Sequence, residues 1–429
     1  MTSRSSSSEI ATKRHSLEAP NSMKRLLMHA RSPWFWVESI CFFIVATHFE
    51  IGEAGSGLAY VIKLACLGII LLPRFAIGGA TIGNGVAWVF ILACVFLSVN
   101  LIETTDRAVI AFALIAVGSA VGQLRDPNWD DRLIALLTVY LVIHLGGFIF
   151  QVGQFLLQGQ ILELHGLIFP SASRAYQIGT AARLSGFQIE PGTYAQWMLM
   201  ATFLRCLLLR RIISPLTVAI VASTLVTLSL WAVIGAALFS AGAIIEAVFQ
   251  STVRNKFRAT YLVLIFGVAF LIFFYSLPDA TIRDSLTYLD VKADLTSTSG
   301  TDKVAAVGAI FERVFDVLIF GAPMGSRFCE ACLSPQDVGI WANLIYYFGL
   351  LPTLAVVGLT AWSIASRWGP SYLPLLVALL SWKAQFYDPF LWIILGYALH
   401  PVARTAPTER VATGEGFEPR PTGTGNLRP

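Results

Sequence analysis

Residues 133–157 read LIALLTVYLVIHLGGFIFQVGQFLL, an apolar run that contains no Asp, Glu, Lys or Arg. An α-helix rises 1.5 Å per residue, so a helix of this length reaches about 37 Å, enough to cross a hydrocarbon core of about 30 Å. We therefore expect a transmembrane helix here. Similar runs recur along most of the chain.

The composition places the whole chain in the same class. Of its 429 residues, 56% are hydrophobic and only 13% are charged, against roughly a quarter charged in soluble domains. We predict an all-α fold, a polytopic transmembrane bundle of about 12 helices embedded in a lipid bilayer, rather than several soluble domains. The net charge of +4 lies largely beside apolar runs, where membrane topology places it, so we expect no nucleic-acid partner.

The spacing of the apolar runs predicts the individual spans and the loops between them. We expect spans at about 34–49, 57–72, 85–101, 108–124, 133–157, 191–209, 261–277 and 339–364, with two more in 212–249 around a turn near Ser229, and two in 372–399 interrupted at 383–388. The domain plan is a disordered N-terminal tail (1–31), an integral membrane domain (32–401) with large loops at 158–190 and 278–338, and a disordered C-terminal tail (402–429).

Basic residues indicate the orientation of the bundle. Lys and Arg concentrate in cytoplasmic loops, and an alternating count of spans agrees with that rule here. The cytoplasmic set comprises the basic N-terminus, Arg74, Arg125, Arg132, Arg210, Arg211, Arg254, Lys256, Arg258, Arg367 and Arg404. Both termini are then cytoplasmic, and both large loops lie on the outer face together with the acidic residues Glu50, Glu53, Glu103 and Asp106.

The cysteines divide into two groups. Cys41, Cys66, Cys94 and Cys206 lie in apolar runs, where we expect them to pack as small core residues. Cys329 and Cys332 lie in the second outer loop, on the oxidising side, where a local structural disulfide is our first interpretation. Two free thiols, or a redox or metal role, are the alternatives.

Lys63 is the clearest charge inside a predicted span. A lysine in hydrocarbon is costly, so we expect it to face the bundle or to extend toward the interface. A role in holding a lipid carrier is an alternative interpretation.

The first large loop ends in RLSGFQIEPG at residues 183–192, which combines charges with helix-breaking residues. Pro191 suits the first position of a helix, and the free N–H groups of Gly192 and Thr193 would form an anion site, which Glu190 itself could occupy. In a purely structural interpretation, Glu190 caps the helix and Arg183 extends to the lipid headgroups. In a functional one, Arg183 neutralises a phosphate and Glu190 takes or positions a proton.

The second large loop contains a predicted amphipathic helix at the membrane surface, from about 302 to 320. Thr301 would cap this helix, and Gly321 and Pro323 would end it. Its polar side carries Lys303, Arg313 and Asp316, and Arg327 and Asp337 follow before the next span. These charges either face water, with Arg313 paired to nearby acidic side chains, or contribute to a site.

Together these two loops resemble the O-antigen polymerase and ligase superfamily of bacterial envelope glycan assembly. The resemblance rests on Arg183-x-x-Gly186 before Glu190-Pro191 in the first loop. In the second loop it rests on a basic residue, an amphipathic helix, the glycine-containing turn 321–325 and the segment 337–352, DVGIWANLIYYFGLLP. The order of elements fits from about residue 34 to 400.

The resemblance implies a glycosyltransferase of the bacterial inner membrane that uses undecaprenyl-diphosphate-linked oligosaccharide on the outer, periplasmic face. It implies inverting transfer without a metal or cofactor, in which positive side chains stabilise the diphosphate leaving group and a carboxylate takes the acceptor proton. Arg183, Lys303 and Arg313, with Arg174 and Arg327, are the expected basic residues; Glu190 is the first choice of base and Asp337 the second. A chain-length regulator and other polysaccharide assembly proteins are further expected partners.

Several activities remain open at this stage. The turn Gly-Ala-Pro-Met-Gly lacks closely spaced glycines, Lys303 stands where arginine is expected, and no histidine lies near Asp337. The last departure favours a polymerase that joins repeat units over a ligase that transfers a finished glycan. A multi-span transporter would show two similar halves with charge at the midplane, and a lipid-linked glycan flippase would carry several cations inside its spans; neither pattern is evident.

Overall fold

The computed structural model describes residues 29–49, 57–76, 81–83, 105–126, 128–171, 173–249, 279–294, 298–312, 319–324 and 338–399, with single positions between 87 and 96 and at 315 and 317. Helices account for 74% of this part of the chain. The predicted spans 85–101 and 261–277 and most of both tails lie outside the described residues, apart from a few helical positions between 87 and 96.

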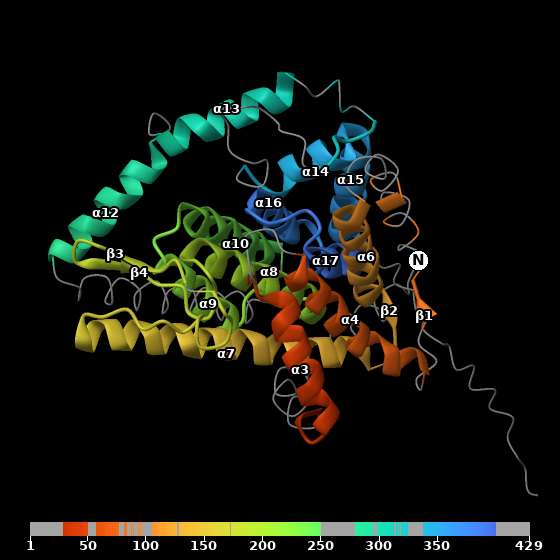
Figure 1. The fold of residues 1–429 in the computed structure, drawn as a ribbon, viewed down its shortest axis with the longest axis horizontal. Coiled ribbons are helices and arrows are strands. Elements are labelled where there is room, and N and C mark those ends of the chain that lie inside the picture. The colour runs from red at the N-terminus through yellow and green to blue at the C-terminus, as the bar shows by residue number, and fades with distance from the viewer. Residues whose placement is uncertain are drawn as a thin grey trace, which may run out of the picture.

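The helices follow the chain in the order shown in Figure 1. In the first half they are α3 (Pro33–Ala46), α4 (Leu58–Ala76), α6 (Thr105–Gly122), α7 (Trp129–Gln158), α8 (Pro191–Leu209), α9 (Pro215–Leu225) and α10 (Leu230–Phe249). In the second half they are α12 (Asp279–Ala293), α13 (Thr298–Glu312), α14 (Ile340–Phe348), α15 (Leu350–Arg367), a short 3₁₀ helix η2 (Pro370–Tyr372), α16 (Leu373–Ser381) and α17 (Pro389–Leu399).

Four of the described helices, α4, α7, α10 and α15, are long and apolar enough to cross a membrane. Five shorter apolar helical segments accompany them, at Pro33–Ala46, Arg107–Gly122, Pro215–Leu225, Pro370–Ser381 and Pro389–Leu399. The fold is therefore a helical bundle suited to a membrane, as the composition predicts.

Helix α8 lies at the centre of the bundle. Every residue from Thr193 to Leu207 is buried, and the helix packs against α7, α9, α10, α16 and α17. A helix that is buried on every face is enclosed by its neighbours. Even Arg205 is buried, because its guanidinium donates to Thr138 Oγ1 (3.3 Å) and Ser214 Oγ (3.1 Å).

Helices α6 and α17 form the most extensive helix contact, and glycines allow it. A Cβ atom added at Gly122 would lie 2.3 Å from the carbonyl oxygen of Ile393, and one at Gly118 would lie 2.7 Å from that of Pro389. From the other side, a Cβ at Gly396 would meet the Ser119 carbonyl at 2.7 Å. Gly118 and Gly122 are four residues apart, the small-xxx-small pattern that lets membrane helices approach closely.

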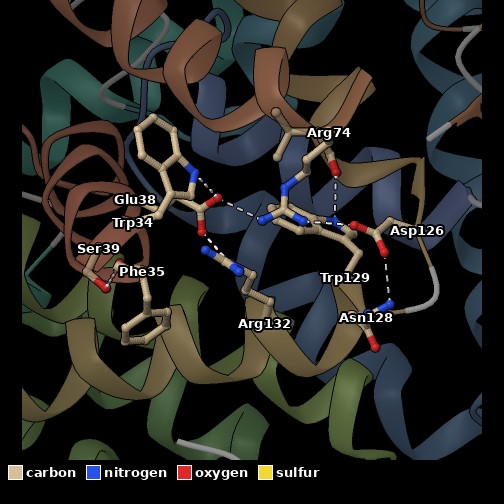
Figure 2. Close-up of polar contacts among 10 residues, drawn as sticks. Trp34, Phe35, Glu38, Ser39, Arg74, Asp126, Asn128, Trp129 and Arg132 are labelled. Carbon is tan, nitrogen blue, oxygen red and sulfur yellow. Dashed lines mark hydrogen bonds and ion pairs between the residues drawn. The ribbon is translucent and has the colours of Figure 1, made fainter. Parts of the chain in front are cut away.

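A buried ion-pair cluster joins α3, α4 and α7 (Figure 2). Glu38, with no exposed surface, accepts from Arg74 Nη2 at 2.8 Å and from Arg132 Nε. Arg74 also donates to Asp126 Oδ2 at 2.9 Å and lies 4.5 Å from the ring of Trp129. Arg74 and Arg132 are both predicted to lie on the cytoplasmic side, and both form ion pairs with the carboxylate of Glu38. Breaking a buried pair leaves an uncompensated charge, so the cluster holds these helices in register.

Several predicted boundaries agree with the structure. Helix α8 begins at Pro191 and ends before Arg210, as expected. The run 212–249 divides into α9 and α10 just before Leu230, where Leu228 adopts a positive φ of 52°. The interruption between α16 and α17 covers residues 382–388, also as expected.

Other predictions were wrong. The run 339–364 is not one span, because Gly349, with φ of 95°, separates α14 from α15, and a Cβ there would lie 2.7 Å from the Ile319 carbonyl oxygen. The amphipathic helix in the second loop runs from Thr298 to Glu312, so Thr301 lies inside it and does not cap it. Cys94 is exposed, unlike Cys41, Cys66 and Cys206, which are buried free thiols.

Two short antiparallel strand pairs and helix α12 were not predicted. Strand β1 (Thr81–Ile82) pairs with β2 (Leu124–Arg125), with Thr81 opposite Arg125. Strands β3 (Tyr176–Ile178) and β4 (Ala181–Arg183) form a hairpin in which Tyr176 lies opposite Arg183. Figure 1 shows α12 and α13 as an arm that runs from this hairpin toward α14, so the two large loops meet at the hairpin.

Candidate functional site

The Arg183 side chain lies between two tyrosines, one from each large loop. Its guanidinium carbon is 5.1 Å from the ring centroids of both Tyr176 on β3 and Tyr288 on α12. Its Nη1 donates to the Tyr176 hydroxyl at 2.7 Å, and the two tyrosine hydroxyls are 2.9 Å apart. Burial raises the pKa of Tyr288, so its ring is neutral at physiological pH. Arg183 is therefore oriented by stacking as well as by hydrogen bonds.

Asp284 fixes the tip of the hairpin to α12. Its Oδ2 accepts from the backbone N–H of Thr180 (2.8 Å) and from the Thr180 hydroxyl (2.9 Å). The bond from that N–H is the main cause of a lowered pKa at Asp284. The carboxylate is therefore ionised at neutral pH. Gly179, beside Asp284, has a positive φ of 56°, which suits the two-residue turn of the hairpin.

We expect a disulfide to form readily between cysteines introduced at Thr180 and Thr281, since their Oγ1 atoms are 3.1 Å apart. Peptide mapping of the oxidised T180C/T281C protein by mass spectrometry should find the two peptides linked in most molecules. The matched control is T180C paired with S381C at the end of α16, which should remain unlinked. Equal linkage in both pairs, or linkage in neither, would contradict the docking of α12 on the hairpin.

Buried polar side chains of α7 fix the segment 183–190 by hydrogen bonds. Gln151 Oε1 accepts from the backbone N–H groups of Ser185 (3.1 Å) and Gly186 (2.9 Å). Gly186 has a positive φ of 57°, a conformation that glycine adopts without strain. Further along, Gln188 donates to the hydroxyl of Tyr140 at 3.0 Å. These bonds preorganise the loop, and they explain the glycine of the Arg-x-x-Gly pattern.

Glu190 occupies the N-cap position of α8, but its side chain makes no capping hydrogen bond. It accepts from Thr193 Oγ1 at 3.2 Å, and its Oε2 lies 3.9 Å from Nη1 of Arg174. The Glu190 side chain therefore does not cap α8, which was the structural interpretation of the sequence. Arg174 is 62% exposed and Glu190 is 29% exposed at the side chain, so this pair is open to water and to a ligand.

Glu163 and His165 organise the same loop from within. Glu163 accepts from the backbone N–H groups of Gly166 and Ser173 (3.0 Å each) and from the Ser173 hydroxyl. Burial alone would raise the pKa of Glu163, but these hydrogen bonds outweigh it and leave the pKa below its usual value. His165 bonds to the Phe187 carbonyl (2.8 Å) and Ser171 Oγ (3.0 Å). Both side chains are structural.

The second-loop candidates are only partly described. Lys303 lies on α13, which packs on α14 through Ala306, Ile310, Ala342 and Tyr346. The remaining candidates of this loop, Arg313, Asp316, Arg327, Cys329, Cys332 and Asp337, lie outside the described residues. Among the described residues of the second loop, Tyr288 reaches Arg183, and sequence reasoning missed it.

Lys63 faces the bundle, as one interpretation of the sequence expected. Its Nζ lies 3.0 Å from Asp388 Oδ2, with both side chains 2% exposed. Asp388 Oδ1 also accepts from the N–H of Phe390 at 2.9 Å, in the first turn of α17. The signal for this partner was present in the sequence, since Asp388 is an acidic residue in an otherwise apolar run.

Comparison of the chain with protein-family models, with curated proteins and with solved structures finds no match in any of the three.

Proposed function

We propose that this protein is a glycosyltransferase of the bacterial inner membrane that joins undecaprenyl-diphosphate-linked repeat units into a polysaccharide on the periplasmic face. The observation that carries the proposal is the meeting of the two large loops, in which Arg183 of the first loop stacks on Tyr288 of the second. On the first loop, Arg174 and Glu190 are paired at the start of the central helix.

These residue types suit the chemistry of an inverting transfer. The acceptor hydroxyl oxygen bonds to the anomeric carbon as the bond from that carbon to the diphosphate oxygen breaks. The diphosphate leaves with the electron pair, and the acceptor proton passes to a carboxylate, for which Glu190 is the candidate. Arg174 and Arg183, with Lys303, Arg313 and Arg327, would stabilise the negative charge that develops on the leaving group.

The environment of Glu190 supports its assignment as the base. Its side chain is partly exposed at the end of a buried helix and accepts one hydrogen bond, from Thr193. A base must reach its substrate, and a carboxylate that already saturates a helix N-terminus could not do so. Asp337 remains the second choice.

A rigid scaffold beneath a solvent-exposed site also favours an enzyme over a transporter. The segment 183–190 is held by hydrogen bonds to Gln151 and Tyr140 of α7, while the side chain of Arg174 is exposed. Catalytic groups on loops are effective when a rigid scaffold positions them. A transporter or a flippase would use charges along a path through the bundle.

Deletion of the gene in its native host tests the proposal. A polymerase mutant should accumulate single lipid-linked repeat units, resolved by mass spectrometry of the extracted lipids. Loss of a ligase would instead leave full-length chains on the polyprenyl carrier. Unchanged polymer on the cell surface would contradict both enzyme assignments and favour a transporter.

A further inference from the structure

The C-terminal ends of α8 and α15 meet at one backbone oxygen. The carbonyl of Leu207, in the last turn of α8, accepts from the indole Nε1 of Trp368 at 2.7 Å and from the backbone N–H of Arg210 at 3.2 Å. Trp368 directly follows α15, whose last residue is Arg367. The helix end that carries Arg210 and the helix end that carries Arg367 are therefore fixed side by side.

Arg367 brings an unpaired hydrogen-bond donor to this junction. Its guanidinium carbon lies 5.8 Å from the ring of Trp368, and that ring lies 6.0 Å from the ring of Tyr397 in the last turn of α17. The Nη1 atom of Arg367 is buried and has no hydrogen-bond partner among the described residues. Most buried polar groups in proteins are paired, since an unpaired one costs free energy. This donor therefore favours an acceptor that the described chain does not supply.

The nearby carboxylates leave both arginines available. Asp130 in the first turn of α7 forms a hydrogen bond with the hydroxyl of Tyr397. Glu246 of α10 is buried and accepts from the backbone N–H of Ile212 at 3.1 Å. Within the part of the chain that the structure describes, neither Arg210 nor Arg367 forms an ion pair with a carboxylate. The junction therefore presents two positive charges to an added anion.

An outward-facing apolar stripe on α15 leads to the same junction. Its large exposed side chains recur at helical spacing, so they share one face; they are Leu351, Leu354, Leu359 and Trp362. Gly358 lies within this stripe, and no atom lies within 4 Å of where its Cβ would be. Helix α15 is long and apolar enough to cross a membrane. A fatty acyl chain packed along the stripe would place its headgroup beside Arg367.

We propose that Arg210 and Arg367 bind the phosphate of an anionic phospholipid whose acyl chain lies along α15. Guanidinium groups donate strong, charge-assisted hydrogen bonds to phosphate oxygens. The rings of Trp368 and Tyr397 suit the boundary between headgroups and hydrocarbon, where these residue types concentrate. Both arginines lie on the predicted cytoplasmic side, and basic pockets between helices on that side bind anionic lipids. The site is at the other end of α8 from Glu190, so it does not depend on the proposed polymerase activity.

Native mass spectrometry of the purified full-length protein in detergent tests the site, with phosphatidylglycerol and phosphatidylcholine of identical acyl chains as probes. The wild type should bind phosphatidylglycerol about tenfold more tightly, because two basic side chains attract its net negative charge. Arg367→Gln should weaken phosphatidylglycerol binding by about tenfold, the loss expected for one charge-assisted contact. Arg125→Gln removes an exposed arginine on the same predicted side; this matched control should bind like the wild type.

Glycerol 1-phosphate, added as a competitor, carries the same phosphate chemistry without acyl chains and should not displace the lipid at equal concentration. Displacement would overturn the lipid as the ligand and assign the site to a soluble phosphate. Arg210→Asn is the second test if Arg367→Gln does not fold, because asparagine tolerates the positive φ of 50° at this exposed position. Equal binding of the two lipids by the wild type, wild-type affinity in a folded Arg367→Gln protein, or equal loss in Arg125→Gln would overturn the proposal.

Discussion

Arg183→Ala should reduce polymer formation by roughly 10²–10³-fold, the effect of removing one preorganised electrostatic donor from an active site. The expectation follows from its placement between Tyr176 and Tyr288, which aims the guanidinium without neutralising it. Arg183→Lys should also be impaired, because an ammonium cannot stack as a planar group or bind a phosphate with two parallel hydrogen bonds. The measurement is the rate at which purified protein extends lipid-linked repeat units.

Two controls separate catalysis from folding in this experiment. Arg211→Ala removes an exposed arginine on the predicted cytoplasmic side and should keep full activity. The T180C/T281C cross-link, introduced together with Arg183→Ala, reports whether the hairpin still docks on α12. Lost polymer with the cross-link intact assigns Arg183 to the substrate. Normal polymer would remove Arg183 from the site.

Gly122→Val should destabilise the bundle by about 3 kcal/mol or more, the upper range for overpacking a core. A Cβ at this position would lie 2.3 Å from the Ile393 carbonyl oxygen and 2.7 Å from the Tyr397 nitrogen, which are backbone atoms on the facing helix. Backbone atoms cannot move aside as a flexible side chain does, so α6 and α17 must separate. Thermal unfolding in detergent should show a clearly lower Tm.

Gly146→Val is the matched control, since it adds the same β-branched side chain to a helix. Gly146 lies on α7, and no atom lies within 4 Å of where its Cβ would be. Valine has a slightly higher helix propensity than glycine, so the stability should change by less than about 1 kcal/mol and the Tm should stay close to that of the wild type or rise slightly. Equal losses in the two variants would contradict the close packing of α6 on α17.

Local patterns in the sequence predicted much of the secondary structure. Pro191 marks the start of α8 because proline suits the first turn of a helix. The length of the run 212–249 requires two helices, and the chain divides just before Leu230. The split at Gly349 could not be read from hydrophobicity, since the run is apolar on both sides. It depends on the approach of the Ile319 backbone, a contact between distant segments.

For the candidate site residues, too, the sequence identified single residues but not their contacts with distant segments. Charge and residue type identified Arg183, Glu190, Arg174 and Lys63 as groups that need an explanation, since isolated charges are rare in apolar sequence. Their partners were not evident: Tyr288 is 105 residues from Arg183 along the chain, and Asp388 is 325 residues from Lys63. Cys94 was expected in the core for the same local reason, yet it lies at the surface.

The sequence by itself determined that this is an apolar helical chain with polar residues gathered in two long segments. Those properties follow from the period and length of hydrophobic runs, which are local. Only the tertiary structure decided that α12 brings the second segment onto the β3–β4 hairpin, and that Lys63 pairs with Asp388 in the bundle. Such pairings depend on which helix faces pack together, and no single segment of sequence contains that information.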